Sequence, residues 1–166
     1  SVLLTAEAWR RPAIRDTVRE VQRCGKKSSL IPLFSYAETV FRTLEYYQPD
    51  LVHFCDMLSI EADGGRLCGR LSALQETIRR RYPHIAIMRS IPIARTGGNA
   101  SATETLALAK LFEPVSDYFL TDTVLTSHGG PASQPVAGFV GITGQTCRWE
   151  TARRLVAAAD IPVILA

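Results

Sequence analysis

The feature that most constrains the fold is a regular alternation of helix-like segments with short apolar runs. A run that is apolar throughout is buried on both faces, which is typical of a strand in a parallel sheet covered by helices. Five such runs follow helical patterns along the chain: Ser28–Phe34, Leu51–Asp56, His84–Ile93, Tyr118–Asp122 and Ile161–Ala166. The sequence therefore predicts an α/β fold built from repeated helix and strand units.

The spacing of these runs indicates how the sheet is built. Their centres lie about 33 residues apart, the size of one βαβ unit. A (β/α)8 TIM barrel on this spacing needs about 260 residues, whereas the chain has 166. We expect a single partial barrel domain over residues 1–166, corresponding to roughly strands 3–7, with Ser1–Leu4 as the tail of an earlier strand. An open five-stranded doubly wound sheet is the physical alternative, and length alone favours it.

Three helix starts are predicted from their first residues. Thr5 is the candidate N-cap of the first helical segment, in which Pro12 fits a first-turn or a restart position and which ends at Gly25. Ser35 is the expected N-cap of a helix through Tyr47. Ser101 and Glu104 have the spacing of a capping box before a helix through Phe112.

Composition and charge exclude several classes of protein. With 46% hydrophobic residues and a net charge of +3, the chain has a globular composition and only a mild positive charge. Its arginine clusters fall on predicted helices, where a solvated face explains them better than a nucleic-acid surface. No apolar run approaches the roughly 18 residues that span a bilayer, and no signal peptide opens the sequence. We expect a cytoplasmic protein that binds neither nucleic acid nor membrane.

The cysteines give no sign of a metal site or a disulfide framework. None belongs to a CxxC pair, and none has a histidine at metal-ligand spacing. Reduced thiols are the expectation for all four, Cys24, Cys55, Cys68 and Cys147.

Asp122 is the candidate catalytic residue. It ends an apolar strand, and a long loop rich in glycine, Thr123–Cys147, follows it. Active sites of parallel α/β proteins lie at the carboxyl ends of the strands. Partial burial there favours a neutral carboxyl and raises its pKa. The alternative is that Asp122 only caps a turn. The length and glycine content of the loop predict a lid that closes over a ligand.

The sequences FLTDT (residues 119–123), GITGQTCRW (141–149) and PVILA (162–166) resemble phosphoribosylanthranilate isomerase, a (β/α)8-barrel enzyme of tryptophan biosynthesis. PDLVHFC (49–55) and IMRSIPI (87–93) resemble that family's fourth and fifth strands. The resemblance implies that the chain runs from the end of the second strand to the end of the seventh. The family's catalytic cysteine and its phosphate-binding glycines would then lie outside this sequence, and the chain alone would not complete the reaction.

The resemblance implies an activity and a set of site residues. The family is an intramolecular oxidoreductase that converts an aminoaldose phosphate to an aminoketose phosphate by an Amadori rearrangement, without a cofactor. Asp122 matches its general acid. Gly141, Thr143 and Gly144 match the loop that closes over the substrate. Arg89 takes the place of a basic residue that meets the substrate carboxylate or phosphate, and its alternative role is a salt bridge to Asp56 or Asp122.

The chain departs from the family pattern at several positions. Ile142 replaces a glycine, Gln145 a lysine and Arg148 an aspartate, and Cys55 stands where the family has histidine. We interpret Cys55 as a buried apolar thiol rather than a base. We also expect no pairing of Cys55 with His53, because we place the two side chains on opposite sides of their strand.

The expected partner is a small phosphorylated sugar, bound by a monomer or a homodimer. Two alternatives stay open. A related barrel could act on or bind another phosphorylated sugar, or the chain could be a barrel without catalytic groups.

Overall fold

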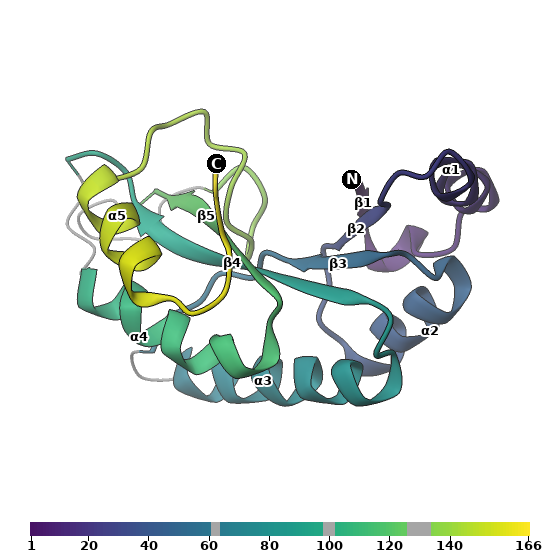
Figure 1. The fold of residues 1–166 in the computed structure, drawn as a ribbon, viewed down its shortest axis with the longest axis horizontal. Helices are drawn as coiled ribbons and strands as arrows, with labels where there is room; N and C mark the ends of the chain where they lie inside the picture. Colours follow the sequence, from purple (N-terminus) through teal and green to yellow (C-terminus); the bar gives the residue numbers. More distant parts are fainter. Residues whose placement is uncertain (61–63, 98–101, 126–133) are drawn as a thin grey trace.

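The computed structural model of the chain describes residues 1–60, 64–97, 102–125 and 134–166. In these residues six strands alternate with helices (Figure 1). The strands are β1 (Val2–Leu4), β2 (Ser29–Pro32), β3 (Leu51–Phe54), β4 (Ala86–Ala94), β5 (Tyr118–Val124) and β6 (Val163–Leu165). The α-helices are α1 (Pro12–Arg23), α2 (Ala37–Tyr47), α3 (Gly64–Arg81), α4 (Ala102–Phe112) and α5 (Trp149–Ala158), and two short 3-10 helices are η1 (Ala6–Ala8) and η2 (Glu113–Val115).

The strands form one parallel sheet in chain order, from β1 to β6. This confirms the α/β class and the parallel sheet. The sheet has six strands rather than five because Val2–Leu4 pairs with β2. A doubly wound sheet is defined by a point at which the strand order reverses. The order of these strands contains no such reversal. Among the described residues β1 and β6 are not paired with each other, so the sheet is open.

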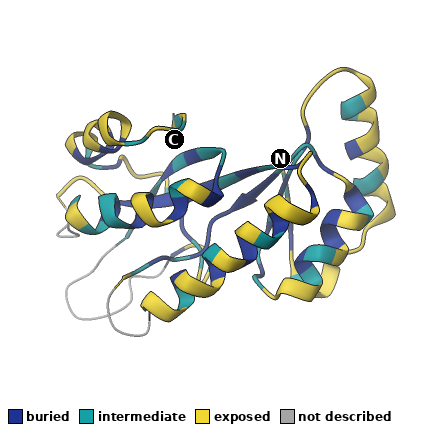
Figure 2. Ribbon diagram, turned by 60° about the horizontal axis from the view of Figure 1, so that its bottom comes forward, coloured by how far each residue is buried: buried dark blue, intermediate teal, exposed yellow. Residues whose placement is uncertain are grey.

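The helices cover one face of this sheet. Figure 1 shows α2, α3 and α4 on one side of the strands, and Figure 2 shows their buried stripes turned inward with exposed residues outward. Leu30, Val52 and Ile87 lie in register on neighbouring strands and are fully buried. They pack with residues of α2 and α3, whereas Phe119 packs with α4 and α5. Burying one such side chain stabilises the fold by about 1.5–3 kcal/mol.

The predicted helix starts have different outcomes. Thr5 as the N-cap is wrong, because it precedes only η1 and makes no side-chain cap hydrogen bond. Pro12 occupies the first turn of α1, one of the two positions predicted for it. Ser35 as the N-cap of α2 is wrong, because the helix begins after Tyr36 without a side-chain cap. The Ser35 hydroxyl instead donates to Asp56 Oδ1, which removes it from capping. Ser101 lies outside the described residues, and Glu104 accepts hydrogen bonds from the Ser59 hydroxyl and the Ile60 amide.

Arg89 lies on the helix-covered face of β4, where it is fully buried (0% exposed). Its Nη1 donates to Asp56 Oδ2 at 2.7 Å, and its Nε donates to Gln75 Oε1 at 2.7 Å. The guanidinium carbon lies 5.1 Å from the ring centre of Phe54 and 4.8 Å from that of Phe112. The predicted contact of Arg89 with a substrate anion is therefore wrong. The alternative, a salt bridge to Asp56, is what the structure shows.

The structure also bears on the expectations for the cysteines and for membrane-spanning helices. All four cysteines carry free thiols, three of them buried and Cys24 exposed. Within the described part of the chain, no helix combines the length and the apolar character needed to cross a membrane.

The buried ion pair predicts a large loss of stability when its acidic partner is neutralised. Asp56→Asn leaves the Arg89 charge buried without a counter-charge, which we expect to cost about 3–5 kcal/mol of unfolding free energy. Glu150→Gln is the matched control, because Glu150 and Arg153 form an exposed pair, typically contributing about 0–1 kcal/mol. Urea unfolding of both variants measures the difference. Equal losses of unfolding free energy in the two variants would show that the buried ion pair stabilises the fold no more than the exposed one.

Candidate active site

The face of the sheet opposite Arg89 carries a row of three polar side chains. His53 of β3, Ser90 of β4 and Asp122 of β5 come from three adjacent strands. Ser90 lies on this face because successive side chains of a strand alternate, so it points away from the face that its neighbour Arg89 occupies. His53 Nε2 lies 2.7 Å from Ser90 Oγ, and Ser90 Oγ donates to Asp122 Oδ2. The three side chains thus form one hydrogen-bonded chain that ends on the predicted acid.

Asp122 lies near the carboxyl end of β5 and is half-buried. Burial raises the pKa of its carboxyl above the ordinary value, and the hydrogen bond from Ser90 opposes this rise. A raised pKa keeps a larger share of the carboxyl protonated than an exposed aspartate would have. Both features suit a proton donor.

The backbone of Gly141 packs directly against this carboxyl. A Cβ added at Gly141 would lie 2.6 Å from Asp122 Oδ1, closer than real Cβ contacts allow, and the residue has a positive φ of 96°. Glycine is needed at this position for both reasons. The structure therefore brings together two residues that the sequence singled out, Asp122 and Gly141.

The neighbouring loop residues are placed differently. Thr143 is half-buried, and its hydroxyl accepts a hydrogen bond from the Gln145 amide at 3.2 Å. Gly144 is exposed, and an added Cβ would meet nothing within 4 Å. Neither residue contacts Asp122 as Gly141 does, and their predicted contact with substrate stays a prediction. Residues 126–133 of the predicted lid lie outside the described residues.

Ile142 holds an unusual backbone conformation beside Gly141. Its φ is +58°, and its side chain is 69% exposed. A β-branched residue is rare in this left-handed region because its side chain crowds the backbone. This is the position where the isomerase family has glycine. Strain of this kind is found at functional sites more often than elsewhere.

Burial acts on two more groups of this face. It lowers the pKa of His53 to about 4, with a further contribution from the Arg89 charge. It also raises the pKa of Cys55 to about 12, helped by the charges of Asp56 and Asp122. At neutral pH the imidazole is therefore uncharged and the thiol protonated. This agrees with Cys55 as an apolar thiol and leaves it unsuited to act as a base.

His53 and Cys55 lie on the same face, so the expectation that they point to opposite sides is wrong. They are two residues apart, and alternate residues of a strand share a face. Both line a cavity of about 80 Å³ between the sheet and the loop that follows β5. Its lining is otherwise mostly apolar and includes Leu3, Ile31, Leu33, Asp122, Val136, Phe139, Val140, Gly141 and Ile142. No lysine or arginine is among these lining residues.

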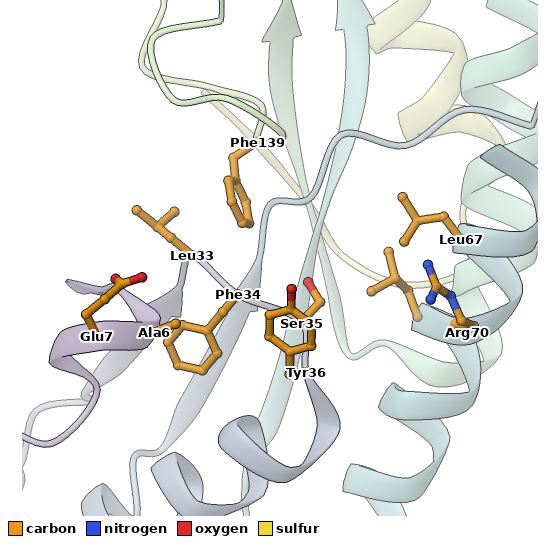
Figure 3. Close-up of a pocket in the computed structure, with 10 residues that line it drawn as sticks. Ala6, Glu7, Leu33, Phe34, Ser35, Tyr36, Leu67, Arg70 and Phe139 are labelled. Atoms are coloured by element: carbon orange, nitrogen blue, oxygen red, sulfur yellow. The ribbon is translucent and has the colours of Figure 1, made fainter. Parts of the chain in front are cut away.

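A larger groove of about 450 Å³ adjoins this cavity at the carboxyl ends of β1 and β2. Leu33 and Phe139 line both spaces. Figure 3 shows Glu7 and Arg70 on opposite sides of the groove, with Phe34 and Tyr36 between them. Arg70 is exposed on α3 and forms no ion pair within the described chain. The remaining lining residues are Ala6, Ser35, Leu67 and Leu71.

Sequence reasoning missed Ser90 and the groove, and it gave His53 no role at the site. The signal for Ser90 and His53 was present, since each is a polar residue inside an apolar run of the kind that forms a buried strand. A buried hydroxyl or imidazole needs a hydrogen-bond partner. The groove had no such signal, because its residues come from four separate segments. Among the described residues, no group of three or more His, Cys, Asp or Glu side chains is arranged to hold a metal ion.

Comparison with known proteins leaves the family open. The chain matches no protein-family model and no curated protein. Among solved structures it is similar to one titled "Crystal structures of catalytic site mutants of active domain 2 of chitinase from Pyrococcus furiosus", with a TM-score of 0.48 and 16% identity. The match covers 68% of this chain and 40% of that one. A likeness of this extent carries no argument about fold or function.

The contact between Gly141 and Asp122 predicts unequal effects of alanine at two loop glycines. Gly144→Ala meets open space and pays only for its left-handed backbone, about 1–2 kcal/mol. Gly141→Ala adds a clash with the carboxyl, which we expect to increase the loss by about 1–3 kcal/mol. Urea unfolding of the two variants tests this order. If Gly141→Ala is no more destabilising than Gly144→Ala, the loop does not pack against Asp122.

Proposed function

We propose that this chain belongs to a phosphoribosylanthranilate isomerase or a close relative and that Asp122 is its general acid. The observation that carries the proposal is the placement of the Asp122 carboxyl. It lies half-buried at the carboxyl end of a parallel strand, against Gly141 and in a mostly apolar cavity. Asp122 and Gly141 are the residues of FLTDT and GITGQT that match the family pattern and lie in contact.

The proposed chemistry begins with protonation of the furanose ring oxygen by the neutral Asp122 carboxyl. The ring C–O bond then breaks as the nitrogen lone pair forms a C=N bond. A base next removes the proton from the adjacent carbon, and the resulting enolamine tautomerises to the ketone as its hydroxyl loses a proton and the carbon bonded to nitrogen gains one. The proton given by the acid balances the proton taken by the base, so the product is an isomer. We assign the base to no residue of this chain, because the pKa of Cys55 is too high.

The two spaces of the site suit different parts of such a substrate. The 80 Å³ cavity beside Asp122 admits only the reacting atoms, whereas the 450 Å³ groove has the size of a ligand site. Phe34, Phe139 and the leucines of the groove offer an apolar surface for an aromatic ring. Arg70 at its edge supplies a cation for the ring's carboxylate.

The proposal extends to the closed (β/α)8 barrel. Six parallel strands in unbroken chain order have the arrangement of consecutive barrel strands. The outer strands expose large apolar side chains, with Leu3 on β1 and Ile164 and Leu165 on β6. Further strands would cover these side chains and pair the open edges.

A second candidate is a related protein that takes another phosphorylated sugar. The cavity around Asp122 has no cation in its lining, Arg89 is paired with Asp56 on the other face, and Gln145 replaces the family's lysine. A thermal-shift screen of sugar phosphates, with phosphoribosylanthranilate among them, distinguishes the two, because a ligand of the native state raises its melting temperature. Stabilisation by a sugar phosphate without an anthranilate group, and not by phosphoribosylanthranilate, favours this candidate.

Neutralising the acid predicts opposite effects on activity and stability. Asp122→Asn removes the proton donor, and we expect kcat to fall by about 10²–10⁴. The same variant is expected to be more stable at pH 7, because burial disfavours the carboxylate. The advantage of the neutral carboxyl is present below the unfolded pKa of about 3.9 and is lost as the pH rises through the raised native value. The stability gain should therefore shrink towards low pH.

Kinetics with phosphoribosylanthranilate and urea unfolding across pH measure these two effects. The protein for the assay is the product of the complete reading frame, with any residues that flank 1–166. Wild-type turnover should fall as the pH rises above the Asp122 pKa, since the acid must be protonated. A wild-type protein that turns over no substrate would remove the isomerase assignment and leave the fold untouched.

The groove predicts that Arg70 affects substrate binding more than chemistry. Arg70→Ala should raise KM by roughly tenfold, the factor for about 1.4 kcal/mol, with little change in kcat. Arg66→Ala is the matched control, because Arg66 is also exposed on α3 but does not line the groove. Michaelis kinetics of both variants decide the point. Equal KM values for the two variants would place the substrate elsewhere.

A further inference from the structure

Ser90 and His53 are buried polar residues for which the proposed chemistry gives no role. Ser90 is fully buried, and His53 is 8% exposed. Both lie in strands whose other buried residues are mostly apolar. Their hydrogen-bonded chain ends on the one carboxyl that the proposal makes catalytic. The arrangement therefore bears on how Asp122 is held.

The hydrogen bonds define where the protons lie. A serine hydroxyl has one hydrogen, and Ser90 gives it to Asp122 Oδ2. The contact of 2.7 Å between Ser90 Oγ and His53 Nε2 then requires that the imidazole donate. Since the ring is neutral when buried, its Nδ1 carries no hydrogen. The chain of donors runs from His53 through Ser90 to Asp122.

We propose that His53 and Ser90 are positioning residues that fix the acid proton of Asp122 on Oδ1. Oδ2 is occupied as the acceptor of the Ser90 hydroxyl, so the neutral carboxyl carries its hydrogen on the other oxygen. Oδ1 is the oxygen that approaches Gly141 most closely, and Gly141 lines the cavity. On the proposed function, Oδ1 is the oxygen from which the substrate's ring oxygen takes the proton. The catalytic part of this inference rests on the proposed function, whereas the proton positions do not.

The same three residue types occur in hydrolases, but in a different order. There the histidine lies between serine and carboxylate, so that it can take the serine proton. Here Ser90 lies between His53 and Asp122, and its hydroxyl donates to the carboxylate. The imidazole donates to the serine oxygen and cannot act as its base. The arrangement thus orients an acid and does not activate a nucleophile.

Few other titratable groups face Asp122. His53 of β3 and Cys55, the residue after β3, are two of them, and both are uncharged at neutral pH. Arg89 of β4 points to the opposite face, where Asp56 neutralises it. The loop residues that line the cavity, from Val136 and from Phe139 to Ile142, carry no titratable side chain. A change at Ser90 should therefore appear directly in the titration of Asp122.

The first experiment is an NMR titration that needs no substrate. The ¹³Cγ resonance of Asp122 gives its pKa in the wild type and in Ser90→Ala and Ser90→Thr. Losing the hydroxyl should raise the pKa by about 1–2 units, the effect of one hydrogen bond to a charged group. Ser90→Thr keeps a hydroxyl and should stay near the wild type. An unchanged Asp122 pKa in Ser90→Ala would overturn the inference.

The second experiment reads the imidazole in the unaltered protein. The ¹⁵N shifts of His53 should show a protonated Nε2 and an unprotonated Nδ1 at pH 7. The opposite tautomer would overturn the inference, even if Ser90→Ala failed to fold. His53→Gln keeps an N–H donor and should preserve the Asp122 pKa, whereas His53→Leu should raise it.

Activity distinguishes this inference from the proposed function. If the wild type turns over phosphoribosylanthranilate, Ser90→Ala should lower kcat roughly tenfold at unchanged KM. Its pH profile should fall at higher pH than that of the wild type, and Ser90→Thr should restore both. Unchanged kinetics in Ser90→Ala would contradict the catalytic role. A wild type without turnover would remove the proposed function, and the two NMR experiments would still decide the proton positions.

Discussion

The buried ion pair of Arg89 and Asp56 is the interaction on which the rest of the structure depends. It joins β4 to the end of β3, and its neighbours come from three further elements: Gln75 on α3, Phe112 on α4 and Ser35 before α2. A buried charge is tolerated only where its partner and its hydrogen bonds are in place. The pair therefore admits one register of β3 against β4.

That register sets the geometry of the opposite face. Phe54 pairs with Arg89, so the residues before and after them, which point the other way, are aligned as well. In these registers His53 lies opposite Met88 and Asp122 lies opposite Pro92. Ser90 is two residues from Met88 and from Pro92 on the same face of β4, so its hydroxyl meets both His53, at 2.7 Å, and Asp122 diagonally. One face of the sheet thus carries the buried Arg89–Asp56 ion pair, and on the other face the Asp122 carboxyl lines a cavity.

Local patterns in the sequence were enough to find the strands and most helices, because an apolar run or a 3.6-residue period depends on neighbours along the chain. The strand-end pattern also led to Asp122, and the resemblance to the isomerase family led to Gly141; the structure places the two in contact. Arg89 was misplaced for a physical reason. A charge in an apolar strand has two faces open to it, and only the packing of α3 and α4 decides which one holds a partner.

Other errors have the same origin. Ser35 has the residue type and position of an N-cap. Its hydroxyl instead donates a hydrogen bond to Asp56, which lies 21 residues further along the chain. The groove beside the cavity combines residues from η1, the β2–α2 loop, α3 and Phe139, which no local pattern joins. The relative placement of His53 and Cys55 could be predicted from strand alternation alone, because residues two positions apart lie on the same face.

Burial shapes the chemistry of this face by acting on each group according to its charge. It raises the pKa of Asp122 and Cys55 and lowers that of His53, so that every group is driven towards its neutral form. The cavity lining holds no cation, and among the described residues the Ser90 hydroxyl is the group that stabilises the Asp122 carboxylate by a hydrogen bond. The pKa of Asp122 is then set by burial, which raises it, and by this hydrogen bond, which lowers it. Loss of the hydroxyl at position 90 would therefore raise the pKa further. Here the pKa of a buried carboxyl is set without a lysine or arginine in the lining of the cavity.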